Sequence, residues 1–292
     1  MLPLSERPAG HPCSLPALLS FRESARDQSR DVGDAFERSD GGPSANELMC
    51  ELDWLLDDAV AAVRGPNGCR LLPDYGEIDR GLTSSTKTVI GRCGSPESHR
   101  LPDAGDWIPC TWKAISGAIS AMDGGAAHSD RMAMWLSPEF ESCEVLLRAG
   151  VDTDLPAMWR SRIEHRVPFQ YLVAACHWRD FVVSVQPGVL IPRPETEQLV
   201  DLAAEAVKAN PILGGHVWVD LGTGSGAIAI GLAGVVVPGG GRLVGVDVRE
   251  VAVEVARGNV RRCGYEVSSH TTPDHIIACR ILLFHITLCS II

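Results

Sequence analysis

Basic residues are in short supply in this chain. Lys and Arg number 26 against 37 Asp and Glu, which leaves a formal net charge of −11. A surface this acidic argues against a protein that wraps around nucleic acid or lies on an anionic membrane.

The 10 cysteines include no Cys-x-x-Cys pair, so we expect no metal site.

Long apolar runs are scarce as well. The longest, residues 276–292, is interrupted by Arg280 and His285, whereas a bilayer-spanning helix needs about 20 mostly apolar residues. We therefore expect no transmembrane segment. The first residues lack the apolar core of a secretory signal, and the acidic residues that follow are not typical of an organellar transit peptide.

The N-terminal part of the chain mixes helical patterns with stretches that have none. Residues 1–43 show no sustained period and end in Gly-Gly-Pro, so we expect a disordered lead. Residues 44–165 are interpreted as a small helical domain with a long irregular insert at 66–130. Ser44 is placed to cap the first helix of this domain. Apolar residues recur at helical spacing over 44–64, 138–148 and 154–165.

From residue 166 the pattern becomes that of an α/β domain. Residues 166–263 alternate β-prone or apolar runs with amphipathic segments, which predicts a doubly wound parallel sheet. The continuous apolar run at 216–221 is typical of a strand that is buried on both faces of such a sheet. Residues 264–292 fit no part of this plan and are interpreted as an atypical apolar tail. The predicted strands are 171–175, 181–185, 216–221 and 243–247, with the first two forming a hairpin, and the predicted helices are 195–209, 227–234 and 250–262.

A glycine-rich turn joins a predicted buried strand to the helix that follows it. It consists of Asp220-Leu221-Gly222-Thr223-Gly224-Ser225-Gly226. Glycines let the backbone approach a ligand closely, and the free N–H groups at a helix start favour a polar or anionic group. Asp247 ends the next strand, where a carboxylate can accept hydrogen bonds from a ribose diol. The pattern therefore predicts a site for a cofactor that carries a ribose.

The residues of the turn leave three interpretations open. The spacing of Gly222, Gly224 and Ala227 fits a dinucleotide fold, which would make the protein a nicotinamide-dependent dehydrogenase. A tight turn without a ligand is the second. The third is an S-adenosylmethionine site, favoured by Asp220 at the strand end with glycine at every second position after it. Asn259, on the last predicted helix, is interpreted as a surface or packing residue, with contact to adenine as the alternative.

A proline-flanked segment separates these interpretations. Residues 189–197 are Val-Leu-Ile-Pro-Arg-Pro-Glu-Thr-Glu, and the runs Pro168-Phe169-Gln170-Tyr171 and Phe181-Val182-Val183 precede them. The two prolines stiffen the chain around Arg193, and Thr196 and Glu197 stand in a capping position at a helix start. Together with the glycine turn and Asp247, this segment closely resembles the release-factor glutamine N5-methyltransferase family (the HemK/PrmC type) over residues 158–262.

The resemblance implies an α/β, Rossmann-like core of an S-adenosylmethionine-dependent methyltransferase, incomplete in this chain, with a small helical N-terminal domain that helps to grip a peptide chain release factor. The implied reaction is methylation of the glutamine side-chain amide in the Gly-Gly-Gln loop of that factor. The run His177-Trp178-Arg179-Asp180 is similar to plant-type organellar members. It is the ground for expecting a chloroplast or mitochondrion, with the cytoplasm as the alternative.

The resemblance also assigns the cofactor site. The cofactor would be S-adenosyl-L-methionine, and Asp247 would hold its ribose hydroxyls. Residues 192–197, Arg193 and Thr196 among them, would close over it. Its methionine part would be lined by Asp220, Gly222, Thr223, Gly224, Ser225 and Gly226.

The chain departs from the family at the catalytic signature. Family members carry Asn-Pro-Pro-Tyr or Asn-Pro-Pro-Phe after the acid that corresponds to Asp247, and these residues aim the target amide nitrogen at the sulfonium methyl. In this sequence Asn-Pro occurs at Asn210-Pro211, before the glycine turn, and nowhere after it. We therefore expect no catalytic residues, negligible turnover and a truncated enzyme. The alternatives are an RNA or DNA adenine N6-methyltransferase and a non-catalytic module that binds the cofactor or a release factor.

Overall fold

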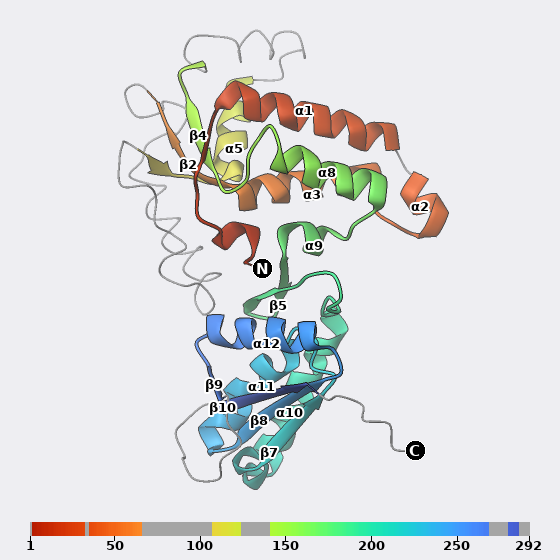
Figure 1. Ribbon diagram of the computed structural model, residues 1–292, viewed down its shortest axis with the longest axis vertical. Coiled ribbons are helices and arrows are strands. Elements are labelled where there is room, and N and C mark those ends of the chain that lie inside the picture. The colour runs from red at the N-terminus through yellow and green to blue at the C-terminus, as the bar shows by residue number, and fades with distance from the viewer. Residues whose placement is uncertain (1, 33–34, 66–106, 124–140, 269–279, 286–292) are drawn as a thin grey trace. The chain divides into compact units, whose positions relative to one another are not determined.

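The computed structural model describes residues 2–32, 35–65, 107–123, 141–268 and 280–285 (Figure 1). These residues divide into two compact units, which meet in the chain between Val173 and Ala174. The sequence predicts a boundary between 165 and 166, a few residues earlier. The difference arises because the short helix α9 (Phe169–Val173) belongs to the first unit.

The first unit contains an antiparallel sheet in the order β1-β4-β2-β3. Its strands come from distant parts of the chain, since Leu147 pairs with His11 on one side and with Val60 on the other. The strands are β1 (His11–Ser14), β2 (Val60–Arg64), β3 (Ile108–Pro109) and β4 (Glu144–Leu147).

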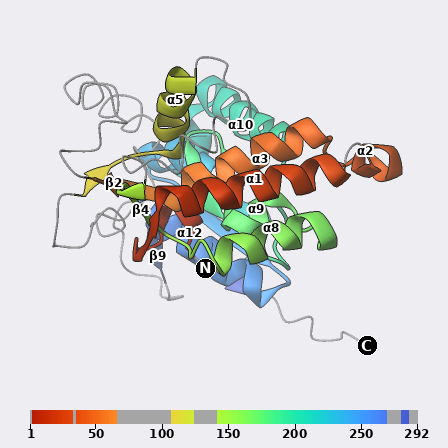
Figure 2. The same cartoon turned by 90° about the horizontal axis from the view of Figure 1, so that it is seen from above.

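Helices supply most of the core of the first unit. Figure 2 shows α1 running between α3 and α8, and leucines on these helices are buried together. The indole N–H of Trp159 on α8 donates to the carbonyl of Ala25 on α1 at 3.1 Å. The buried Arg162 guanidinium contacts the Glu51 carboxylate on α3 at 2.6 and 3.0 Å. The helices are η1 (Leu4–Glu6), α1 (Leu15–Val32), α2 (Ala35–Asp40), α3 (Ala45–Ala59), α5 (Trp112–Asp123) and α8 (Asp154–His165).

The prediction of a disordered lead over 1–43 is wrong for the residues described. Strand β1 pairs with β4, and α1 buries Leu15, Leu18 and Leu19. These leucines stand close together in a mostly polar segment, so the apolar stripe is short, and its burial depends on α3 and α8. Tertiary packing, rather than local pattern, therefore orders this segment.

Further corrections concern strands that the sequence pattern assigns to helix or loop. The helix after Ser44 ends at Ala59, and residues 60–64 form β2 instead. Of the predicted helix at 138–148, the described part contains β4, and α5 lies within the expected irregular insert. Short apolar runs fit a buried strand as well as a helix, and pairing with distant strands decides between them here. The predicted helix at 154–165 and the cap at Ser44 are confirmed.

The second unit contains a parallel sheet in the order β7-β8-β10-β9 and an antiparallel hairpin of β5 and β6. Helices α11 and α12 pack along the sheet, and α10 packs on α11 (Figure 1). The strands are β5 (Ala175–Trp178), β6 (Phe181–Ser184), β7 (Val217–Leu221), β8 (Arg242–Asp247), β9 (Glu266–Ser268) and β10 (Arg280–His285). The helices are η2 (Pro194–Thr196), α10 (Glu197–Ala209), η3 (Pro211–Gly215), α11 (Ala227–Val236), η4 (Val237–Gly239) and α12 (Glu250–Arg262).

The alternating strands and helices of this unit confirm the α/β prediction, with three corrections. Residues 169–173 are helical, so the hairpin starts at Ala175. The tail at 264–292 contributes β9 and β10, and β10 lies between β8 and β9. Strand β7 is not buried on both faces, because alternate side chains stay exposed while Asp220 is buried. The exposed fractions are 50% for Val217, 56% for Val219 and 76% for Leu221.

Candidate functional site

The glycine turn lies at the carboxyl end of β7, next to the end of β8. The N–H groups of Gly222 and Thr223 donate to the carbonyl of Val246 on β8 at 2.7 and 2.9 Å. Gly222 has a φ of +77°, and a Cβ atom there would meet nothing within 4 Å. The turn is therefore anchored to the neighbouring strand while its backbone faces open space, which is the geometry that lets a ligand approach the chain closely.

Gly226 closes the turn against a helix. Its φ is +81°, and a Cβ atom there would lie 3.0 Å from the Cβ of Ala256 on α12. Its N–H donates to the carbonyl of Thr223 at 2.8 Å, and its carbonyl accepts from Ile230 in the first turn of α11. A side chain at this position would strain the backbone and collide with α12, so the sequence needs glycine here.

Asp220 is the buried acid of the site. Its carboxylate accepts a hydrogen bond from the Thr223 hydroxyl at 2.7 Å. Burial raises the pKa of Asp220, and the nearby charge of Asp247 raises it further, while hydrogen bonds from Thr223 and the backbone of Ala229 oppose the shift. The hydrogen bonds let an acid occupy the floor of the turn and tie the side chain of Thr223 to the end of β7.

Asp247 ends β8 and faces the turn. One carboxylate oxygen accepts from the N–H of Gly224 at 2.9 Å, and the other accepts from the N–H of Arg249 at 2.9 Å. Each carboxylate oxygen has a further lone pair, so Asp247 can accept additional hydrogen bonds from a ligand hydroxyl. The structure thus brings together Asp220, Thr223, Gly224 and Asp247, as the sequence predicts.

The proline-flanked segment lies at the start of α10. Arg193 is exposed, and its carbonyl accepts from the N–H of Thr196 at 3.0 Å. Thr196 occupies the N-cap position of α10, as predicted, but its backbone is helical and its side chain makes no capping hydrogen bond. The Glu197 carboxylate instead accepts from the backbone N–H of Arg179 in the β5–β6 turn at 3.0 Å, and the Arg179 guanidinium pairs with Asp201 at 2.9 Å. The hairpin, rather than a local cap, therefore fixes the start of α10.

A buried asparagine connects the hairpin to the glycine turn. Asn259 on α12 is fully buried, and its amide bonds to the backbone of Ser184 on β6 and to the carbonyl of Ser225. The sequence interpretation of Asn259 as a packing residue agrees with this burial. The pattern did not show that Asn259, Arg262 and Ser184 act together, because only the fold brings the end of β6 beside α12.

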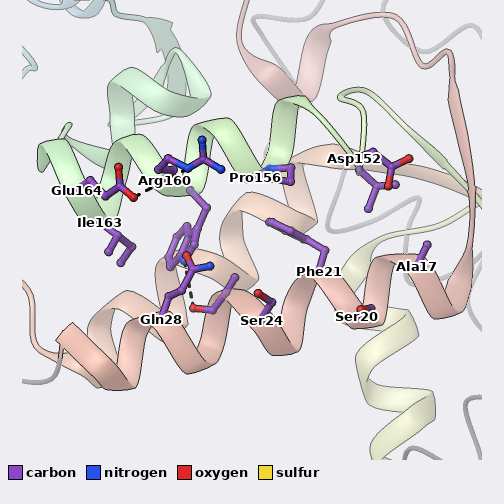
Figure 3. A pocket seen from close by; sticks show the side chains of 13 residues that line it. Ala17, Ser20, Phe21, Ser24, Gln28, Asp152, Pro156, Arg160, Ile163 and Glu164 are labelled. Atoms are coloured by element: carbon purple, nitrogen blue, oxygen red, sulfur yellow. Dashed lines mark hydrogen bonds and ion pairs between the residues drawn. The ribbon is translucent and has the colours of Figure 1, made fainter.

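The first unit contains a cavity of about 480 Å³ between α1 and α8 (Figure 3). Phe21, Trp159 and Ile163 form its apolar lining. Arg160 and Glu164, which also line it, lie 4.0 Å apart on neighbouring turns of α8, so that their opposite charges compensate one another. This lining offers no arrangement of nucleophile and base for chemistry, so we place the candidate functional site at the glycine turn.

In the part of the chain that the structure describes, no group of three or more His, Cys, Asp or Glu side chains is arranged to hold a metal ion. Among the same residues, no helix is long and apolar enough to cross a membrane.

A parallel sheet with a glycine turn after β7, an acid at the end of β8 and helices packed along it has the architecture of a Rossmann-like core. The similarity to known proteins assigns this core to the methyltransferase class. The family of ribosomal protein L11 methyltransferases matches residues 200–284. Curated release factor glutamine methyltransferases are also similar to this chain. That of Gloeobacter violaceus is 47% identical over 116 residues, that of Thermosynechococcus vestitus 46% over 110, and that of Synechocystis 41% over 119.

The similarity to these relatives is partial. It covers 40%, 38% and 40% of this chain and 39%, 36% and 39% of the three relatives, in the same order. The chain therefore matches about two fifths of the length of these relatives.

Proposed function

We propose that this chain binds S-adenosylmethionine at the glycine turn and serves in the methylation of the glutamine amide in the Gly-Gly-Gln loop of a peptide chain release factor. The observation that carries the proposal is the joint placement of the turn, Asp220 and Asp247 at the ends of two adjacent parallel strands. The similarity to enzymes named release factor glutamine methyltransferase supports the choice of substrate.

The residues present fit this cofactor. The open space beside Gly222 admits a ligand against the backbone, and Asp247 retains lone pairs for two ribose hydroxyls. When bound, the cofactor supplies an electrophilic methyl group on a sulfonium. In the proposal, residues 222–226 hold its methionine part, Asp220 anchors that turn, and Arg193 and Thr196 belong to the segment that covers it.

An amide nitrogen is a weak nucleophile, so this reaction depends on groups that aim it at the methyl donor. The described site has an acid and a backbone turn for the cofactor, and the sequence has no Asn-Pro-Pro-Tyr for the amide. Asn210, the asparagine that does precede a proline, is exposed at the end of α10 and ends that helix. We therefore expect the purified chain to bind the cofactor and to transfer methyl groups at a negligible rate.

Binding of radiolabelled S-adenosylmethionine, measured by equilibrium dialysis, tests the cofactor assignment. Asp247→Ala should weaken binding at least tenfold, because hydrogen bonds to a charged group contribute about 1.5–3 kcal/mol and about 1.4 kcal/mol corresponds to tenfold. Asp180→Ala, at an exposed acid of the hairpin turn, is the matched control and should bind like the wild type. Equal binding by the Asp247 variant would contradict the assignment.

A non-catalytic module that binds the cofactor or a release factor is a second candidate, favoured by the missing Asn-Pro-Pro-Tyr. Incubation of the chain with a release factor and labelled cofactor distinguishes this module from an active methyltransferase. Retention of the factor without methyl incorporation supports the module, and incorporation at the Gly-Gly-Gln loop supports the enzyme. Ribosomal protein L11 should be assayed in parallel, because the matched family is named for it. RNA in the same assay tests the adenine methyltransferase alternative, which the net charge of −11 disfavours.

We also propose an organellar location, in the chloroplast or mitochondrion. The support is the run at 177–180 in the hairpin, which is similar to plant-type organellar members of the family. Imaging of the fluorescently tagged gene product tests this location, and exclusively cytoplasmic fluorescence would contradict it.

A further inference from the structure

Asn259 on α12 binds the backbone of two other segments, the end of β6 and the glycine turn, with a single amide group. Its Oδ1 accepts from the N–H of Ser184 at 2.7 Å, and its Nδ2 donates to the carbonyl of Ser184 at 2.9 Å. The same Nδ2 donates to the carbonyl of Ser225 in the glycine turn at 2.9 Å. A side-chain amide carries an acceptor and two donor hydrogens at one end, so it satisfies all three backbone groups at once.

Arg262, one turn further along α12, fixes the orientation of this amide. Its guanidinium donates to Oδ1 of Asn259 at 2.8 Å, to the Ser184 hydroxyl at 2.8 Å and to the carbonyl of Val182 at 3.0 Å. Two donors therefore converge on Oδ1, while Nδ2 faces two carbonyls. Rotation of the amide by 180° would place Nδ2 against the donors of Ser184 and Arg262, and Oδ1 against the carbonyls of Ser184 and Ser225. One orientation is therefore strongly preferred.

The glycine turn is consequently held from outside at two neighbouring points of α12. Ala256 abuts Gly226, and Asn259, three residues later on the same helix, holds the carbonyl of Ser225. The peptide that joins Ser225 to Gly226 is fixed between these contacts. Gly222, at the other end of the turn, borders open space.

We infer that Asn259 is a positioning residue that sets the geometry of the glycine turn for the methionine part of the cofactor. The inference rests on the proposed cofactor site and adds a residue that contacts the glycine turn without contacting the ligand itself. Asn259 acts on the carbonyl of Ser225, whereas Asp247 accepts from the N–H of Arg249, which lies outside the turn, as well as from the N–H of Gly224. Loss of the Asn259 amide should therefore affect the methionine end of the ligand more than its ribose end.

Two ligands that differ in that end provide the test. S-adenosylhomocysteine has the amino acid end, and 5′-methylthioadenosine lacks it. Asn259→Asp keeps the acceptor for Ser184 and Arg262 but places a carboxylate oxygen against the carbonyls of Ser184 and Ser225. We expect it to weaken S-adenosylhomocysteine binding at least tenfold and 5′-methylthioadenosine binding less than twofold in isothermal titrations. Asn210→Asp makes the same chemical change at an exposed position and is the matched control.

A second variant covers the case in which Asn259→Asp fails to fold. Arg262→Gln leaves the three backbone contacts of Asn259 in place and removes the guanidinium that orients it, so it should weaken S-adenosylhomocysteine binding about threefold and spare 5′-methylthioadenosine. Equal losses for both ligands in the folded variants, or no loss, would overturn the inference. Failure of the wild-type chain to bind either ligand would overturn the proposed function, and the inference with it.

Discussion

Gly226 shows how one residue joins the backbone geometry of the turn to the packing of a helix. Its positive φ and its contact with Ala256 both require a residue without a side chain. The glycine pattern and the acid at Asp247 could be predicted because their spacing follows from the strand, turn and helix that carry them. The contacts of Asn259 could not, since its partner Ser184 lies 75 positions earlier in the chain.

Asp58 in α3 carries a pH-dependent stability cost. Burial raises its pKa to about 6, the charge of Asp57 adds to the shift, and Arg148 opposes it. The pKa of an aspartate in the unfolded chain is about 4, so the wild type should lose stability as the pH rises from about 4 to 6 and show no further loss from this group above that range. Two pKa units correspond to roughly 3 kcal/mol.

The variant Asp58→Asn removes this titration. Urea unfolding at several pH values should show equal stability of variant and wild type near pH 4, and a more stable variant at pH 7.5. Asp31→Asn, at an exposed position of α1, should follow the wild-type curve throughout. A stability difference that is the same at both pH values would contradict the assigned titration.

At the scale of elements, local signals and long-range pairing contribute unequally. Helix α3 begins where its capping sequence predicts, because the Ser44 side chain accepts from the N–H of Glu47 and the Glu47 carboxylate accepts from the N–H of Ser44. Strands β2 and β4 could not be predicted in this way, since their short apolar runs fit a helix as well as a strand. They become strands by pairing with each other across 80 residues of chain, as the contact between Arg64 and Glu144 illustrates.

The capping box gives a test of local stabilisation. Ser44→Ala removes the acceptor for the Glu47 N–H and should lower the free energy of unfolding by about 1 kcal/mol, as for other N-cap serines. Urea denaturation measures the change. Ser120→Ala, on the exposed side of α5, should be neutral or slightly stabilising because alanine favours helix. An Ser44→Ala protein as stable as the wild type would show that the helix start is held by packing alone.

At the scale of the whole molecule, the sheet of the second unit has an apolar surface in contact with solvent. Val217, Val219 and Leu221 are exposed on β7, and among the described strands β7 pairs only with β8. The continuous apolar run predicted a strand buried on both faces, and a single sequence could not show that one face stays exposed. An exposed apolar strand at a sheet edge favours association between molecules.

Val219→Lys should therefore reduce self-association of the purified chain. Sedimentation velocity over a range of concentrations should show a concentration-dependent increase in mass for the wild type and a smaller one for the variant. The free energy of unfolding should change by less than about 0.5 kcal/mol, because Val219 is 56% exposed. Leu202→Lys, at an exposed position of α10, serves as the control away from the sheet edge. A wild-type chain that stays monomeric at all concentrations would contradict this prediction.

The order of the strands has a consequence for synthesis on the ribosome. Strand β9 leaves the ribosome before β10, yet in the described sheet β9 pairs only with β10, which in turn pairs with β8. The backbone N–H and C=O groups of β9 therefore stay without a strand partner until residues 280–285 have been synthesised. Parallel pairing that depends on a later strand is slow, and until it forms the strand edges are open to other chains. A released chain that ends before residue 280 should thus have a second unit that is more readily cleaved by protease than the same unit in the full chain.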